Sequence, residues 1–383
     1  MCDILKHTTM KTGDKTMKKI HRTLSLFTVT AMCAALLCSC GAVSDSSQTD
    51  SSSKAATTTT ADTTADTTTT GEASSTASAA SAPDSSVSDS SSAVTDDTKT
   101  NGITPAMWKV TSPEGNTMVM LGSFHALKDE CYPLPEAVTN AYNNADILAV
   151  ECDITSTSED GEYMKNLMKQ MLYNDNTKLS QHISEEAYSA LQTYLGYWGM
   201  DISALEVYRP WAVSSTLDTL LIQDSDFDTE KGLDNFLLTT AHADGKEIYE
   251  VESVDFQMNL LINFSDDIYD LMFRSYKGET KESQKQALED LYTAWKSGDI
   301  ETFLEEDNEE ELAGYTEEDK KIAEDYNNQM LYDRNKNMAK AAEDLMSQGK
   351  NVFYVVGAAH YAGEGGIIDL LEKDGYTAER VQY

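Results

Sequence analysis

The chain has 383 residues, 40% of them hydrophobic, and a formal net charge of -36 at pH 7. A surface with this excess of carboxylates repels nucleic-acid phosphates and anionic lipid headgroups. The sequence also has no basic patch with interleaved aromatic residues. The composition therefore argues against a nucleic-acid-binding protein, and it leaves enough apolar residues for a globular core.

The N-terminal segment has the layout of a bacterial lipoprotein leader. Residues 17–41, MKKIHRTLSLFTVTAMCAALLCSCG, run from basic to apolar to small residues, which is typical of a secretory signal and short for a transmembrane helix. The end of this run resembles a lipobox, which predicts cleavage before Cys40 and a lipid on its thiol. Met17 opens a better signal than Met1, and the start codon stays open. We expect residues 1–40 to be a signal peptide and the protein to be lipid-anchored at the outer face of the cytoplasmic membrane. The alternative is an ordinary secreted protein.

A low-complexity segment follows the leader. Residues 41–101 consist almost entirely of Ser, Thr, Ala and Asp and contain no aromatic residue. Such a segment cannot bury enough apolar surface to offset the entropy lost on ordering it, which predicts a disordered linker. Residues 102–383 then form one folded domain. Its two cysteines, Cys131 and Cys152, could pair outside the cytoplasm, and the sequence leaves that pairing open.

The first elements of the domain predict a βαβ unit. Two β-rich runs, MWKVTS and TMVMLGSF, flank the turn at 113–116 and predict a hairpin. A helix is expected from Pro135, and the apolar run 146–153, DILAVECD, predicts a buried strand. Strand, helix and strand in this order favour parallel pairing.

The middle of the domain is predicted to be mostly helical. Apolar residues recur at helical spacing in 161–174, 184–199 and 211–223. Strand patterns return at 247–252 and 351–358, with helices between them and at the end. We therefore expect an α/β fold, with a central mixed, largely parallel sheet flanked by helices and a helical middle segment.

Two histidines stand in the same context. GSFH, Gly122 to His125, and GAAH, Gly357 to His360, each follow an apolar run. Because ligands bind at the carboxyl ends of parallel strands, both imidazoles are expected at one sheet edge. A single histidine of this kind more often satisfies a loop hydrogen bond, but the repeated context favours a site.

Acidic residues end two further strands. Glu151 closes a buried run and needs a cation, a metal or hydrogen bonds. With His125 and His360 it forms a candidate set of ligands for a divalent metal (Mn²⁺, Co²⁺ or Zn²⁺), which would activate water. Glu252 is either a further ligand or general base, or a salt-bridged acid. Asp153 either shares the face of Glu151 or is a solvated strand end.

Arg334 lies in a predicted helix before the last core strand. It is expected to stabilise an oxyanion or to pair with the buried carboxylates. Alternatively, Arg334 is a surface residue, as most arginines are.

The order of these motifs resembles the TraB/GumN family. The string at 122–153, GSFHALKDECYPLPEAVTNAYNNADILAVECD, is similar to the opening of such proteins. Further matches follow in family order: RPWAV at 209–213, GLD at 232–234, Gln257, Arg334-Asn335 and VVGAAHYAGEGGIIDLLEKDGY at 355–376.

This resemblance implies a fold and an activity. The family is similar to the Tiki metalloproteases and to the erythromycin esterase (EreA)/ChaN-like folds, which implies an α/β sheet and, in the Tiki branch, metal-dependent peptide cleavage. By position it implies catalytic roles for His125, Glu151, Arg334 and His360, with Asn335 as an additional site residue. Ser123 stands where threonine is usual, and Ala359-His360-Tyr361 where Gly-His-Leu is commoner; both changes keep the histidines.

Two classes of function follow from these patterns. One is a metal-dependent hydrolase, peptidase-like, that acts on an extracellular peptide or small molecule. The other is a non-catalytic surface lipoprotein that binds a peptide, a metal or a small ligand. Convergence of His125, Glu151 and His360 within metal-ligand distance would favour the first.

Overall fold

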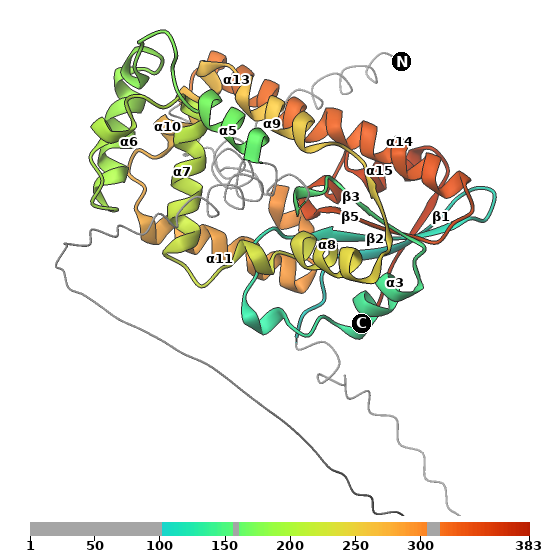
Figure 1. Ribbon diagram of the computed structural model, residues 1–383. Coiled ribbons are helices and arrows are strands. Elements are labelled where there is room, and N and C mark those ends of the chain that lie inside the picture. Colours follow the sequence, from blue (N-terminus) through green and yellow to red (C-terminus); the bar gives the residue numbers. More distant parts are fainter. Residues whose placement is uncertain (1–101, 156–160, 305–314) are drawn as a thin grey trace, which may run out of the picture. The chain divides into compact units, whose positions relative to one another are not determined.

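The computed structural model describes residues 102–155, 161–304 and 315–383 (Figure 1). The predicted signal peptide, Cys40 and the predicted linker up to residue 101 lie outside the described residues.

A six-stranded sheet forms the centre of the domain. Its order is β4-β3-β5-β2-β1-β6. The four strands β4, β3, β5 and β2 are parallel to one another, whereas β1 is antiparallel to both β2 and β6. This arrangement confirms the predicted mixed, largely parallel sheet and the hairpin at its start. The strands are β1 (Met107–Thr111), β2 (Thr117–Ser123), β3 (Ile147–Val150), β4 (Glu247–Glu250), β5 (Val352–Gly357) and β6 (Thr377–Arg380).

The burial of each strand explains its composition. Every residue of β3 and β5 is buried, which is why ILAV and VFYVVG carry no alternating polar positions. The outer strands β4 and β6 are largely exposed. In the register of the sheet, Ser123 pairs with Gly357 and Val150 with Val355. The carboxyl ends of β2, β3 and β5 therefore meet, and we call this line the carboxyl edge.

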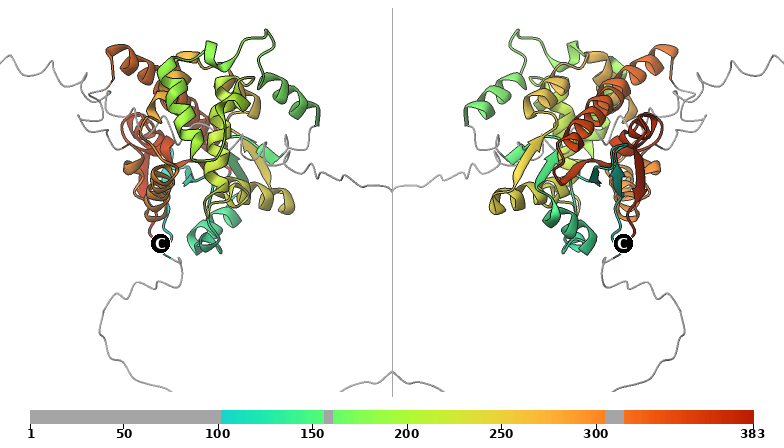
Figure 2. Two further views of the ribbon diagram at one scale, coloured as in Figure 1. Left: turned by 90° about the vertical axis from the view of Figure 1, so that its left-hand side faces the viewer. Right: turned by 90° about the vertical axis from the view of Figure 1, so that its right-hand side faces the viewer.

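Helices cover the sheet and extend beyond it (Figures 1 and 2). In Figure 1, α14 and α15 lie on one side of the sheet and α3 and α8 on the other, while α5, α6, α7 and α10 gather away from it. The helices are α3 (Glu136–Asn144), α5 (Gly161–Gln170), α6 (Glu185–Gly196), α7 (Pro210–Gln223), α8 (Leu233–Asp244), α9 (Val254–Ile262), α10 (Asp266–Ser275), α11 (Lys281–Ser297), α13 (Glu317–Asn327), α14 (Asp333–Ser347) and α15 (Ile367–Lys373).

Shorter helical segments connect these elements. The 3-10 segments are η1 (Asp129–Cys131), η2 (Leu179–Gln181), η3 (Ile202–Leu205), η4 (Thr229–Lys231), η5 (Ile300–Leu304) and η7 (Ala358–Tyr361), and η6 (Asn328–Tyr332) is π-helical. A π-helical turn leading directly into α14 is notable because such turns are frequent at functional sites. No helix within these described segments combines the length and apolar character needed to span a bilayer.

The helix ends follow local chemistry. Ser184 caps α6, since its side chain accepts a hydrogen bond from the Ala187 N–H. The pattern at 161–174 predicts a helix to Asn174, but α5 ends at Gln170. Beyond it, the chain pairs with the segment before α7 through a bridge between Leu172 and Tyr208. The apolar pattern continues past the end of the helix, where Met171 is buried and Leu172 is exposed.

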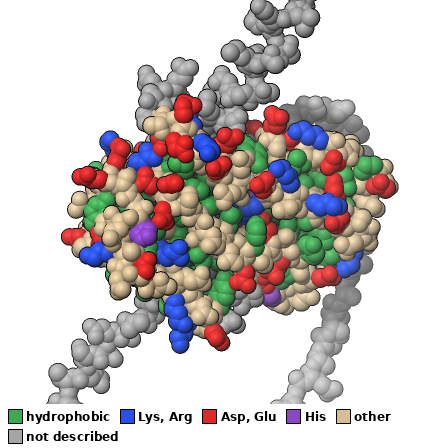
Figure 3. All heavy atoms as spheres, turned by 90° about the horizontal axis from the view of Figure 1, so that it is seen from above, with side chains coloured by type: hydrophobic (Ala, Val, Ile, Leu, Met, Phe, Trp, Pro, Cys, Tyr) green, Lys and Arg blue, Asp and Glu red, His purple; other side chains and the backbone are tan. Residues whose placement is uncertain are grey.

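Charged side chains are spread over the surface. On the face in Figure 3, Lys and Arg side chains are scattered among Asp and Glu side chains and form no single cluster. The two cysteines of the domain are buried and are not joined by a disulfide. Cys131 lies 3.1 Å from the Tyr292 hydroxyl and Cys152 lies 3.5 Å from Oε1 of Gln257, which answers the question of their pairing.

Candidate active site

Glu151 lies at the centre of the site, one residue beyond β3. Its Oε1 accepts a hydrogen bond from the Gly357 N–H at 2.7 Å. Its Oε2 accepts from Gln257 Nε2 at 2.9 Å and from Arg334 Nη2 at 2.7 Å. Burial alone would raise the pKa of Glu151, but the charge of Arg334, helped by the nearby histidines, holds that pKa well below its usual range. Glu151 is therefore a buried, ionised carboxylate.

Arg334 joins two carboxylates. It is the second residue of α14. Besides its bond to Glu151, it donates hydrogen bonds to Glu252 from Nε at 2.9 Å and from Nη2 at 2.8 Å. Its Nη1 donates to the Met330 carbonyl at 3.1 Å. Each guanidinium nitrogen thus has an acceptor. Of the two roles predicted for Arg334, stabilising an oxyanion and pairing with buried carboxylates, the structure shows the second. Glu252 is correspondingly in the salt-bridged arrangement.

His360 is fixed by its neighbour on α14. Its Nδ1 lies 2.6 Å from Oδ1 of Asn335, whose Nδ2 donates to the Gly365 carbonyl at 2.9 Å. Because the amide nitrogen of Asn335 is used in this way, Oδ1 is the acceptor and Nδ1 of His360 carries the proton. The other nitrogen, Nε2, lies 3.7 Å from Oε1 of Glu151. Burial and the charge of Arg334 lower the pKa of His360 to about 3, so the ring is neutral at pH 7.

His125 is fixed by α8. Its Nδ1 lies 2.8 Å from Oδ2 of Asp234, in the first turn of that helix. Desolvation lowers the pKa of His125, but the charge and the hydrogen bond of Asp234 outweigh it and raise the pKa to about 9. The ring, whose side chain is 35% exposed, is therefore protonated at pH 7.

Two glycines let these groups approach one another. A Cβ on Gly357 would lie 3.1 Å from Oε1 of Glu151, 3.6 Å from the His360 ring and 3.7 Å from Nε2 of His125. A Cβ on Gly232 would lie 2.1 Å from the carbonyl oxygen of His125, so the loop carrying His125 packs directly on the start of α8. The structure thus brings His125, Glu151, Arg334 and His360 together around Gly357.

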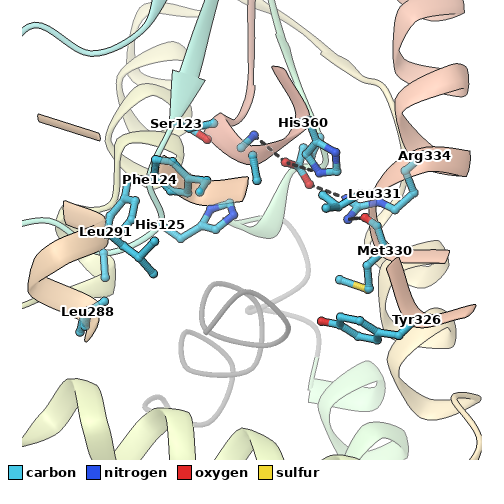
Figure 4. Close-up of a pocket in the computed structure, with 16 residues that line it drawn as sticks. Ser123, Phe124, His125, Leu288, Leu291, Tyr326, Met330, Leu331, Arg334 and His360 are labelled. Atoms are coloured by element: carbon cyan, nitrogen blue, oxygen red, sulfur yellow. Dashed lines mark hydrogen bonds and ion pairs between the residues drawn. The ribbon is translucent and has the colours of Figure 1, made fainter. Parts of the chain in front are cut away.

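A pocket opens above this group (Figure 4). It contains about 810 Å³ of space without atoms, part of it open to solvent. All four predicted site residues line it. The others are Ser123, Phe124, Ala126, Leu288, Leu291, Phe303, Tyr326, Met330, Leu331, Gly357, Ala358 and Ala359. The arrangement is a polar floor at the carboxyl edge below an apolar wall, which suits an organic ligand with one polar group.

Only part of this group of side chains has the features of a divalent-metal site. Both imidazoles hold their Nδ1 on an acceptor and leave Nε2 for a ligand, as metal-binding histidines do. Glu151, however, already accepts from Gly357, Gln257 and Arg334. Within the described residues, no three or more His, Cys, Asp or Glu side chains are grouped so that they could hold a metal ion. The predicted set His125, Glu151 and His360 does not fit a three-ligand centre in this arrangement.

Asp153 lies apart from this group. Its Oδ2 is 2.7 Å from Nε2 of His242, and its Oδ1 accepts from the Thr155 hydroxyl at 2.6 Å. It is 7% exposed, so the expectation of a solvated strand end is wrong. The strand ends at Val150, and the chain has turned before Asp153, which gives it different neighbours from Glu151.

The chain matches a known protein family. The model of the TraB/PrgY/gumN family matches residues 106–380. The chain belongs to the TraB/PrgY/gumN family. The family match spans the whole sheet and all the helices that carry the site, and it agrees with the resemblance seen in the sequence motifs.

Curated TraB relatives are similar at low identity. The uncharacterized protein YbaP of Escherichia coli is 26% identical over 157 residues, which cover 41% of this chain and 56% of YbaP. A metalloprotease TIKI homolog of Nematostella vectensis is 25% identical over 293 residues, covering 65% of this chain and 61% of the relative. Metalloprotease TIKI2 of Danio rerio is 25% identical over 164 residues, 38% of this chain and 32% of the relative. The chain thus spans less than two thirds of the length of these relatives. No solved structure matches.

Asp234 is the site residue that the sequence motifs did not single out. It stands in the GLD string, 109 residues from His125. Nothing in the spacing links the two, because the contact depends on Gly232 bringing α8 against the loop after β2. The GLD motif was the one feature of the sequence that could have pointed to Asp234.

Proposed function

We propose that the domain is a hydrolase that cleaves an amide or ester bond of a peptide substrate at the carboxyl edge. The observation that carries this proposal is the meeting of His125 and His360 around Gly357 in one pocket, each with its Nδ1 held by a partner. The names of the TIKI relatives support a peptide as the substrate.

The two histidines differ in protonation, which assigns them different roles. Titratable pairs whose environments separate their pKa values supply an acid and a base. Neutral His360 holds the attacking water by accepting a hydrogen bond on Nε2. It takes the proton as the new C–O bond forms and makes the water oxygen acidic, and ionised Glu151 stabilises the imidazolium that results. Cationic His125 donates to the carbonyl oxygen as negative charge develops there and then protonates the leaving group.

The metal-dependent form of this proposal has narrower support. It draws on the names of the TIKI relatives and on the two available Nε2 atoms. Since Glu151 is held by Arg334, no step of the reaction is assigned to a metal here. Mn²⁺, Co²⁺ and Zn²⁺ are the ions to test.

The second candidate function is ligand binding without catalysis. One observation favours it: Arg334, Glu151 and Glu252 already satisfy one another, as in a purely structural network. In either case we propose that the protein is anchored outside the cytoplasmic membrane through a lipid on Cys40, as its lipobox-like sequence suggests.

Cleavage of a randomised peptide library, followed by mass spectrometry, separates the two functions. Wild type should cleave, and His125→Ala and His360→Ala should each lose at least about 100-fold in rate, the usual contribution of a positioned acid or base. His242→Ala, which changes a histidine outside the pocket, should keep full activity. Absence of cleavage by wild type, with or without added metal, would leave the binding function.

Calorimetric titration of the same variants tests the metal. If a metal binds at this site, wild type should bind Mn²⁺, Co²⁺ or Zn²⁺, and each His→Ala change should weaken binding by about 10-fold or more. Cleavage that persists in EDTA would exclude metal dependence while retaining the hydrolase.

A further inference from the structure

The pocket has an apolar wall that faces the catalytic group. Figure 4 shows Phe124, Leu288 and Leu291 on one side and Met330 and Leu331 on the other, with His125 between the two sides and His360 above Leu331. The side chains of α11 and η6 thus frame a space that no described residue of the core fills. A cavity of this kind needs an apolar occupant to replace the water it would otherwise hold against hydrocarbon.

The wall is rigid on the side of α11. Phe124 packs against Trp295, Tyr292 and Phe303, with ring centroids 6.0 to 6.4 Å apart. Trp295 in turn donates from Nε1 to the Gly122 carbonyl at 3.0 Å, which ties α11 to the end of β2. The apolar wall and the catalytic His125 are therefore held in a fixed relation.

Ser123 is a polar group on this side of the pocket whose hydroxyl has no partner among the described residues. Its residue is 2% exposed and its hydroxyl makes no hydrogen bond with the part of the chain that is described. A buried hydroxyl left without a partner has lost its hydrogen bonds to water without replacement, which destabilises the unliganded pocket. It lies at the end of β2, two residues before His125, and lines the pocket. A ligand can provide the missing acceptor or donor.

Resting on the proposed function, we propose that this wall is a specificity pocket for a large apolar side chain next to the cleaved bond, and that the Ser123 hydroxyl bonds to the backbone amide of that same substrate residue. Both features adjoin the catalytic atoms, so the occupant is part of the substrate and not a remote ligand. The strongly acidic chain repels peptides rich in Asp and Glu, which agrees with an apolar substrate segment.

Binding of matched peptides tests this proposal without requiring turnover. The probes are N-acetyl-Ala-X-Ala-N-methylamide peptides with X either leucine or asparagine, which are close in shape and differ in polarity. Their affinities for the full chain are measured by ligand-observed NMR. Wild type should bind the leucine peptide at least about tenfold more tightly than the asparagine peptide. The asparagine side chain must give up its hydrogen bonds to water when it is buried, whereas the leucine side chain has none to lose.

Two variants locate the effect. Leu288→Phe fills the wall and should abolish the preference, whereas Leu288→Met conserves volume and should retain it. Ser123→Ala should weaken binding of both peptides about five- to tenfold without lowering the melting temperature, since it removes an unpaired group. Ser203→Ala, an exposed serine on η3, is the control. A lower melting temperature for Ser123→Ala with unchanged affinity would assign the hydroxyl a structural role and overturn its part of the proposal.

The outcomes separate this inference from the hydrolase itself. Equal affinity for the two peptides, or no binding of the leucine peptide, overturns the specificity pocket even if the library is cleaved. Preferential binding of the leucine peptide by a chain that cleaves nothing supports the pocket and contradicts the hydrolase.

Discussion

Arg334 has no freedom to reach a substrate, because all three nitrogens of its guanidinium are bonded to Glu151, Glu252 and Met330. Its guanidinium pairs with both buried carboxylates and holds the pKa of Glu151 well below its usual range. Glu151 can then hold His360 and the Gly357 N–H in place. The residue acts on the chemistry through Glu151.

Removing this cation should be costly. Arg334→Met leaves Glu151 and Glu252 buried without their partner, and breaking a buried pair in this way costs about 3–5 kcal/mol. Urea unfolding at pH 7 measures the loss. The matched control is Lys336→Met on the same helix, which breaks an exposed pair with Asp333 and should cost less than about 1 kcal/mol. Similar losses for the two variants would contradict a buried charge network.

The sequence predicted which residues meet at the carboxyl edge better than it predicted the bonds between them. Because β2, β3 and β5 are buried parallel strands, the residues just beyond them had to meet at one edge, and His125, Glu151 and His360 do. A carboxylate partner for Arg334 was predicted, but the particular Arg334–Glu252 and Asp234–His125 contacts were not, since each joins a helix to a loop after a strand and the sequence pattern does not specify that packing. Asp153 was placed on the same face as Glu151 on the assumption that the strand continued, but the strand ends at Val150.

At the scale of elements, the close contact between α8 and the loop after β2 positions His125. Gly232 makes it possible, because any side chain there meets the His125 backbone at 2.1 Å. The sequence patterns predicted the strands and most helices correctly, but such contacts between distant elements depend on shape and were not predicted. The π-helical turn before Arg334 was likewise invisible, since its residues continue the helical spacing of α13.

Gly232→Ala should therefore both destabilise the protein and displace His125. A backbone clash of this size is expected to cost more than about 2 kcal/mol. Gly196→Ala is the control, because Gly196 ends α6 with nothing near its Cβ and its replacement should stabilise by up to about 1 kcal/mol. Melting temperatures of the two variants at pH 7 give the comparison. Equal melting temperatures would show that α8 and the loop do not pack as described.

At the scale of the whole molecule, the lipid anchor that we propose on Cys40 would give the domain a location at the membrane surface. A diacylated cysteine anchors firmly, whereas one acyl chain binds a membrane only weakly. The folded domain would then work on substrates outside the cell membrane, where the predicted linker of residues 41–101 separates it from the lipid surface.

Metabolic labelling tests this location. Cells fed a clickable fatty acid should label the wild-type protein, and Cys40→Ala should lose the label because the acceptor thiol is absent. Cys131→Ala, which removes a buried thiol of the domain, is the control and should keep it. Equal labelling of wild type and Cys40→Ala would contradict a lipid anchor at this residue.

The central claim is that one pocket holds a cationic and a neutral histidine side by side, and ¹⁵N NMR of the imidazoles tests it most directly. Full-length protein labelled at histidine is titrated from pH 4 to pH 10, with His125→Gln and His360→Gln used for assignment. We predict that His125 loses its proton only near pH 9 and that His360 stays neutral, with its proton on Nδ1, down to pH 4. His125 then stabilises the fold below its unfolded pKa near 6.5, and this contribution disappears as the pH rises through 9. If both rings titrate together near pH 6.5, the acid–base pair does not exist and the proposed mechanism is wrong.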